Sequence, residues 1–172
     1  VLTYEKPGKL LREYFTDIIE RDVRRHVSAR SSLALNQLVK AVFESTGSEL
    51  SQRSLAGMLG VTADTVGSYL DACDAAYVLV QCPYFTFSER QRTARNRKYY
   101  PIDLGLRNAV VTKTGLDKGK KLETIVFLHL RKKYRQVCYW RGRGEIDFVV
   151  QDENGITPYQ VSWDGFKERH QK

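Results

Sequence analysis

The segment from Ser51 to Ala75 constrains the fold of this chain more than any other, because two short helical patterns meet there at a glycine. Ser51 stands where a serine hydroxyl caps the start of a helix, and Thr62 stands in the same place before a second helix. Gly60, between the two patterns, suits a tight turn. A short helix, a turn and a second helix predict a helix-turn-helix.

Apolar residues at helical spacing predict the buried face of each helix. The inward-facing residues are expected to be Leu55, Met58 and Leu59 in the first helix and Val66, Tyr69, Leu70 and Cys73 in the second. Segments 77–84 and 99–102 follow as two strand-like runs joined by a basic loop. Together they predict a two-stranded wing, and the unit as a whole is typical of a winged helix.

Two amphipathic helices precede this unit. Residues 10–26 carry apolar side chains at helical spacing, and so do residues 35–43, in a second helix that is expected to end at Gly47. We expect residues 1–32 to form a linker helix and residues 33–112 to form the winged-helix domain. Residues 113–172 are then left for a second domain.

The charges of the predicted winged helix divide unevenly between its parts. The exposed face of its second helix offers Asp64, Thr65, Ser68, Asp71 and Asp74. Acids there oppose phosphate, and the arginine contacts that dominate base recognition are missing, so sequence-specific reading by this helix is not expected. The wing loop carries Arg90, Arg92, Arg95, Arg97 and Lys98. Such a loop can bind DNA phosphates by charge alone; a solvated hairpin tip, or a contact for an acidic protein, stays open beside that interpretation.

The last third of the chain predicts two strands, 144–150 and 156–162, joined by a turn at Asp152–Gly155. Asp147 and Gln160 would lie on neighbouring strands and share a face. Upstream, residues 121–130 read as a buried helix whose one acid is Glu123, and a buried carboxylate is costly unless it is paired or binds a metal. Carboxylate and amide oxygens suit Mg²⁺ or Mn²⁺, although most acids on strand faces are simply solvated.

Helix, acid-bearing strand and Gln-x-Ser strand in this order resemble the core of the PD-(D/E)xK nuclease-like fold. Further motifs extend the resemblance to a prokaryotic group with an AAA-type P-loop ATPase domain followed by a winged helix and a nuclease-like domain of unknown function. These are Lys98-Tyr99-Tyr100-Pro101-Ile102-Asp103-Leu104-Gly105-Leu106-Arg107-Asn108, the Leu122-Glu123 helix, Tyr139-Trp140-Arg141, Glu145-x-Asp147 and the helix from Arg12 to Arg25.

The resemblance implies an α+β architecture in which Glu123, Asp147 and Gln160 are the catalytic and metal-binding positions. Ser162 stands where the family has a lysine. A hydroxyl cannot bring positive charge to an anionic transition state, so a degenerate, non-cleaving site is expected. An active nuclease would need a substitute ammonium or guanidinium group, for which Lys121 and Arg143 are the nearby candidates. The nuclease-like domain is also expected to be truncated at its C-terminal end.

Composition adds a few limits. The net charge is +8 in 172 residues, which permits a nucleic-acid partner. A second basic patch is expected near the acids, where it would guide a phosphate backbone or simply form a solvated helix end; it comprises Arg131, Lys132, Lys133, Arg135, Arg141 and Arg143. Three cysteines without metal-site spacing are typical of a reduced, cytoplasmic protein. No apolar run is long enough to span a membrane.

Two functions follow as hypotheses. In the first, the chain is the C-terminal accessory region of an AAA-type ATPase and binds nucleic acid through its wing and basic patches. It contains no Gly-x-x-x-x-Gly-Lys-Ser/Thr, so ATP would bind only in the upstream ATPase domain that the resemblance implies. In the second, the chain is a protein-interaction or homo-oligomer module without a nucleic-acid role, as the acidic helix face favours.

Overall fold

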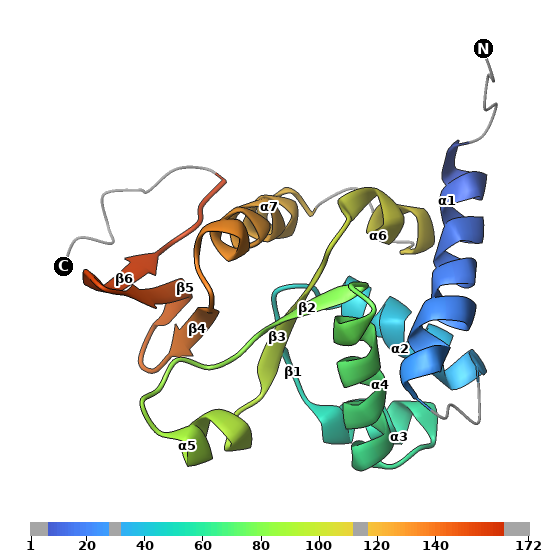
Figure 1. Ribbon diagram of the computed structural model, residues 1–172, viewed down its shortest axis with the longest axis horizontal. Coiled ribbons are helices and arrows are strands. Elements are labelled where there is room, and N and C mark those ends of the chain that lie inside the picture. The colour runs from blue at the N-terminus through green and yellow to red at the C-terminus, as the bar shows by residue number, and fades with distance from the viewer. Residues whose placement is uncertain (1–6, 28–31, 112–116, 164–172) are drawn as a thin grey trace.

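The computed structural model describes residues 7–27, 32–111 and 117–163, and it combines helices with two small sheets (Figure 1). The first part contains α1 (Pro7–Asp17), η1 (Ile18–Asp22), η2 (Val23–His26), α2 (Ser32–Glu44), β1 (Glu49–Leu50), α3 (Gln52–Leu59), α4 (Ala63–Ala75), β2 (Leu79–Cys82), α5 (Glu89–Ala94), β3 (Arg97–Pro101) and α6 (Leu104–Val110). The second part contains α7 (Lys118–Lys133), β4 (Val137–Arg141), β5 (Glu145–Asp152) and β6 (Gly155–Tyr159). The expected α+β class is confirmed. In the described part of the chain, no helix is long and apolar enough to cross a membrane.

The helix expected over residues 10–26 is α-helical only as far as Asp17. The chain then continues through a π-helical turn, η1, and a 3₁₀ turn, η2. Ile19 and Val23 are completely buried in these two turns. Apolar side chains thus stay on the core through the change of helical pitch.

Helices α3 and α4 form where their capping residues predict. The Ser51 hydroxyl accepts a hydrogen bond from the N–H of Ser54 at 3.3 Å, and the Thr62 hydroxyl accepts one from the N–H of Thr65 at 3.1 Å. Gly60 ends α3 in the left-handed region, with φ 65°. The prediction that Met58 faces inward is wrong, since its side chain is 60% exposed.

The first sheet is antiparallel, with the strand order β1-β3-β2. Leu79 pairs with Pro101 and Cys82 with Lys98, so the two strand-like runs found in the sequence do pair. Their connection is not a simple basic loop, because it contains α5, which Ser88 caps through the N–H of Gln91. The short strand β1 was not expected from the sequence.

The second sheet is also antiparallel and runs in the order β4-β5-β6. Strands β5 and β6 meet at a tight turn, where Asp152 pairs with Gly155 and Gly155 takes φ 117°. The expected hairpin is therefore present, although β6 ends at Tyr159, before Gln160. A change of register between Cys138 and Trp140 makes a bulge in β4.

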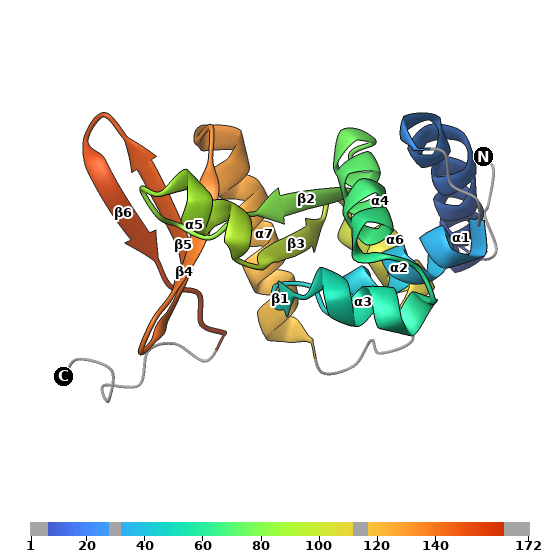
Figure 2. The same ribbon diagram turned by 90° about the horizontal axis from the view of Figure 1, so that it is seen from below.

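Strand β3 contributes to two hydrophobic cores, one on each of its faces. Tyr99 packs in the core formed by the helices of the first part, whereas Tyr100 packs with Phe127 and Phe148 in the core of the second part. The rings of Tyr100 and Phe127 are stacked with centroids 4.2 Å apart. In Figure 2 the strands β2 and β3 accordingly lie between the helices α1–α4 and the sheet β4–β6. A strand of the first part thus contributes side chains to both cores.

Arg107 of α6 is one of the largest fully buried side chains, with 2% exposure. Its Nε donates to the carbonyl of Phe43, near the C-terminus of α2, at 2.8 Å. Its Nη2 donates to the Asp117 carboxylate, which directly precedes α7. One guanidinium therefore joins three helices, and it satisfies a helix-end carbonyl that has no partner within its own helix.

Replacement of Arg107 by Leu is expected to destabilise the fold by about 3 kcal/mol or more. The largely buried Asp117 carboxylate would lose its donor, and the Phe43 carbonyl would keep only the Thr46 hydroxyl. The control is Arg24→Leu, which removes an exposed ion pair with Glu20 and should cost less than about 1 kcal/mol. Urea unfolding followed by circular dichroism measures both. Equal losses in the two variants would contradict the structural role of Arg107.

Candidate functional site

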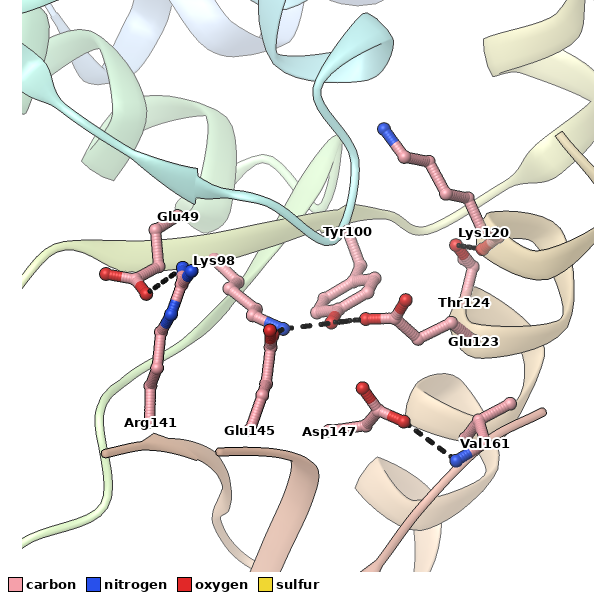
Figure 3. Close-up of polar contacts among 10 residues, drawn as sticks. All are labelled: Glu49, Lys98, Tyr100, Lys120, Glu123, Thr124, Arg141, Glu145, Asp147 and Val161. Atoms are coloured by element: carbon pink, nitrogen blue, oxygen red, sulfur yellow. Dashed lines mark hydrogen bonds and ion pairs between the residues drawn. The ribbon is translucent and has the colours of Figure 1, made fainter. Parts of the chain in front are cut away.

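A polar cluster lies where β3 meets the second part of the chain, and Lys98 is at its centre (Figure 3). The Lys98 side chain is 2% exposed. Its Nζ is 2.6 Å from Oε1 of Glu145 and 3.8 Å from Oε1 of Glu123. It also lies 5.2 Å from the centre of the Tyr139 ring. The ammonium group is thus enclosed by two carboxylates and an aromatic face, which stabilise its charge.

Glu123 enters the same cluster from α7. Its Oε1 accepts a hydrogen bond from the Tyr100 hydroxyl at 2.6 Å. The loop after α2 passes so close to Glu123 that a Cβ on Gly47 would lie 2.9 Å from Oε1, and Gly47 itself has φ 74°. A side chain at position 47 would therefore be strained and would push the carboxylate away.

Asp147 faces this space from β5, as Figure 3 shows. Its Oδ2 accepts a hydrogen bond from the N–H of Val161 at 2.7 Å, so the backbone beside Gln160 lies next to it. Gln160 is exposed, as is Ser162. The structure therefore brings Glu123 and Asp147 to one place and puts the segment that carries Gln160 and Ser162 beside them.

The surroundings of the two acids change their proton affinity. Burial raises the pKa of Glu123, and Asp147 and Glu145 raise it further, while the Tyr100 hydroxyl and Lys98 act in the opposite direction. Burial also raises the pKa of Asp147, against the effects of the Val161 N–H and Lys98. Burial and the nearby Glu123 raise the pKa of Tyr100, which keeps its hydroxyl protonated as a donor.

The fit of a divalent cation to this cluster is incomplete. Glu123 and Asp147 each have one carboxylate oxygen that accepts no hydrogen bond from the described residues of the cluster, which is compatible with a hard cation. However, the Lys98 ammonium already supplies positive charge beside Glu123. Among residues 7–27, 32–111 and 117–163, no three His, Cys, Asp or Glu side chains are placed to hold a metal ion.

The basic residues of the expected wing loop belong to α5 and its ends. Arg90 is exposed. Arg92 is held by Glu89 at 3.0 Å and by the Thr86 carbonyl at 2.8 Å. The guanidinium of Arg95 lies over the Tyr84 ring, 4.9 Å from its centre. Two of the three arginines are therefore fixed by contacts within the connection.

The remaining predicted nucleic-acid contacts have different environments. The expectation that Lys98 lies on a solvent-facing loop is wrong, because its charge is buried among carboxylates. Arg97 lies on β3 and donates to the side chain of Gln81 at 2.6 Å. Arg141 pairs with Glu49 of β1 at 3.0 Å, and Arg143 is exposed in the turn after β4.

Sequence reasoning missed the residue that supplies an ammonium group to the acids. Lys121 and Arg143 were the expected candidates, whereas the ammonium group beside Glu123 and Glu145 is that of Lys98, on a strand outside the segment expected to be nuclease-like. The signal available in the sequence was its place one strand period before Tyr100, which puts both side chains on the same face. Without the fold, nothing showed that Glu123 packs against that face.

Comparison with known proteins gives the chain a family. A model described as a domain of unknown function, DUF8612, matches residues 1–118 of the 172. The chain belongs to the DUF8612 family. A second model, the domain of unknown function DUF4143, matches residues 118–170, and that family is commonly found at the C-terminus of AAA-type ATPases.

Two curated relatives of this DUF8612 member are uncharacterized proteins. The one from Haemophilus influenzae is 22% identical over 99% of the chain and 45% of its own length. The one from Methanocaldococcus jannaschii is 26% identical over 85% of the chain and 34% of its own length. The chain thus spans less than half the length of each of these relatives. No solved structure matches it significantly.

The raised pKa of Glu123 predicts how stability depends on pH. Between its ordinary value of 4.5 and the higher value in the fold, the native state holds the extra proton, so stability falls as pH rises through this window. Glu123→Gln removes this decline. The variant should therefore gain free energy of unfolding relative to the wild type as pH rises from below 4.5 to neutral.

Urea unfolding at a series of pH values measures this difference. The exposed Glu153→Gln variant gives the baseline effect of losing one carboxylate elsewhere. A difference between Glu123→Gln and wild type that shrinks with rising pH would mean that Lys98 outweighs burial at Glu123.

Proposed function

We propose that the chain is the C-terminal accessory region of an AAA-type ATPase and that it binds nucleic acid through the basic surface around α5. ATP would bind in the ATPase domain of the parent protein, not in these residues. The DUF4143 match and the greater length of both curated relatives support a place within a larger protein. The α3-turn-α4 unit and the β2–β3 pair support its interpretation as a winged helix with α5 in the wing.

The observation that most directly supports nucleic-acid binding is the pair of contacts that Tyr84 makes, one with Arg95 and one with Arg141. Its ring lies under Arg95, and its hydroxyl donates to the carbonyl of Arg141 at 3.3 Å. Basic side chains from two separate parts of the chain, at the end of α5 and at the β4–β5 turn, are thereby brought to one exposed surface. Charge alone gives such a surface affinity for phosphates without base specificity.

The face of α4 fits a role without base readout. Asp64, Ser68 and Asp71 are exposed there, and the described residues of α4 include no Arg or Lys. These acids would repel a phosphate backbone. The proposed contact therefore runs through α5 and the β4–β5 turn and leaves α4 away from the DNA.

Binding of fluorescent DNA followed by anisotropy at several salt concentrations tests this function. Removal of two phosphate contacts by Arg90→Ala with Arg95→Ala should weaken binding and reduce the log–log salt slope by about two. The control pair, Lys9→Ala with Lys40→Ala, removes equal charge from exposed positions on α1 and α2 and should change binding little. Absence of binding at low salt, or equal losses in both pairs, would refute the proposal.

We also propose that Glu123, Asp147 and Gln160 form a degenerate nuclease-like site with weak affinity for Mg²⁺ or Mn²⁺. The geometry of the two acids supports the site. The Lys98 ammonium beside Glu123 supports its weak affinity for a cation, and Ser162, in the position of the family's lysine, supports its degeneracy. When bound, a cation would supply charge neutralisation for a phosphate. The chain's own contribution would be to orient the two carboxylates through the Tyr100 hydroxyl and the Val161 N–H.

Thermal unfolding with added Mn²⁺ tests this weak site. Stabilisation should reach only about 1.4 kcal/mol at ten times the dissociation constant, and it should vanish in Asp147→Asn. Asp152→Asn, in the exposed β5–β6 turn, is the control that should keep the shift. A protein whose stability does not respond to Mn²⁺ would have no metal site here.

A second function is favoured by a different observation. An apolar groove of about 580 Å³ lies between α1 and the segments around Tyr77 and Ile102. Tyr14 and Tyr77 in its lining are 51% and 75% exposed. Such a groove suits a protein partner or a second copy of the chain, and this interaction module is the function left if the protein fails to bind DNA.

A further inference from the structure

A cleft of about 610 Å³ lies between the two parts of the chain and is lined by four arginines. Arg92 and Arg97 come from α5 and β3 on one side. Arg131 comes from the end of α7 and Arg135 from the segment that leads to β4 on the other side. The two halves thus build the cleft together. In the sequence these residues belonged to two separate basic patches.

The acids in the lining are already engaged. Both oxygens of Asp74 accept hydrogen bonds from Gln81, at 3.3 and 3.1 Å, and Glu89 pairs with Arg92. Four guanidinium groups therefore face two carboxylates, which leaves an excess of two positive charges in the cleft. A concave, positively charged surface attracts polyanions more strongly than a flat one of equal charge.

The arginines of one wall are held in place. Gln81 fixes Arg97 through a hydrogen bond of 2.6 Å and is itself held by Asp74. Arg92 is fixed by the Thr86 carbonyl, and its buried Nε has no hydrogen-bond partner within the described residues. Guanidinium groups that are fixed in advance lose little freedom on binding, and their planar donor pairs match phosphate oxygens.

An exposed aromatic ring lies on the segment that anchors this wall. Phe87 is 77% exposed, and it directly follows Thr86, whose carbonyl binds Arg92. Its ring packs edge-to-face on Phe85, with centroids 5.5 Å apart, and the N–H of Phe85 donates to Tyr139. Phe87 is therefore a supported ring with a free face. A basic groove with an exposed aromatic ring is the combination that binds single-stranded nucleic acid.

We propose that this arginine cleft binds single-stranded nucleic acid, with backbone phosphates between the two arginine pairs and a base stacked on Phe87. The inference rests on the proposed nucleic-acid function and adds the strand state and the place of binding. The volume of the cleft suits a segment of nucleotide size. A duplex keeps its bases paired and stacked, so it cannot offer one to Phe87 without the cost of flipping it out.

Fluorescence anisotropy compares a labelled single strand with a hairpin duplex of the same sequence at equal salt. The wild type should bind the single strand at least tenfold more tightly. Arg131→Gln with Arg135→Gln, both at exposed positions, should remove most of this preference. Phe87→Ala should also remove most of it, because the loss of base stacking weakens single-strand affinity by roughly five- to a hundredfold. Arg97→Lys, which keeps the charge but not the planar fork, should weaken single-strand binding by a smaller factor.

Two controls match these changes. Lys9→Ala with Lys40→Ala removes two exposed charges that do not line the cleft, and Tyr14→Ala removes an exposed aromatic ring on α1. Both should leave the single-strand preference intact. Circular dichroism establishes that every variant is folded.

The outcomes separate the inference from the function on which it rests. The proposed binding in the cleft is refuted if single strand and duplex bind equally and if neither Phe87→Ala nor the Arg131 and Arg135 changes affect binding. If Arg90→Ala with Arg95→Ala still weakens binding in that case, the nucleic-acid function stands without it. A protein that binds neither DNA refutes both proposals.

Discussion

The alternation of side chains along β3 is the constraint on which the rest of the structure depends. Neighbouring residues of a strand point to opposite faces, so Tyr99 and Tyr100 must enter different environments. Tyr99 completes the helical core, and Tyr100 stacks on Phe127 of the second core. Lys98 shares the face of Tyr100 and is therefore carried into the junction between the parts. A shift of one residue in the register of β3 would exchange all three environments at once.

The alternation along β3 also gives the positive charges of two neighbouring residues different roles. Lys98 is desolvated, and the carboxylates of Glu145 and Glu123 compensate for the loss of water. Arg97, the next residue along, reaches the cleft on the opposite side of the strand and is aligned there by a neutral amide. The charge of Lys98 is neutralised within the fold, whereas the charge of Arg97 stays available to a ligand. Sequence composition counts both residues equally, although only one contributes to the external field.

Local features of the fold could be predicted from the sequence because they depend on neighbouring residues. The caps at Ser51 and Thr62, the left-handed Gly60 and the β5–β6 turn each follow from chemistry within a few positions. The burial of Lys98 could not be predicted, since it depends on α7 packing against β3, which places Glu123 beside a residue 25 positions earlier in the chain. The exposure of Met58 was missed because helical spacing identifies the apolar face of a helix but not how much of that face the rest of the protein covers. The arginine cleft likewise exists only once the two parts are docked.

The three cysteines are divided between the two parts of the molecule, and this division has a practical consequence. Cys73 lies in the helical core, whereas Cys82 packs in the second core and Cys138 is buried in β4 beside it. Burial raises the pKa of Cys73 to about 12 and that of Cys138 to about 11, so the thiols are unreactive while the chain is folded. The rate at which each thiol is alkylated then reports how often the structure around that thiol opens. The order in which the thiols are modified would distinguish one cooperative folding unit from two that open in turn.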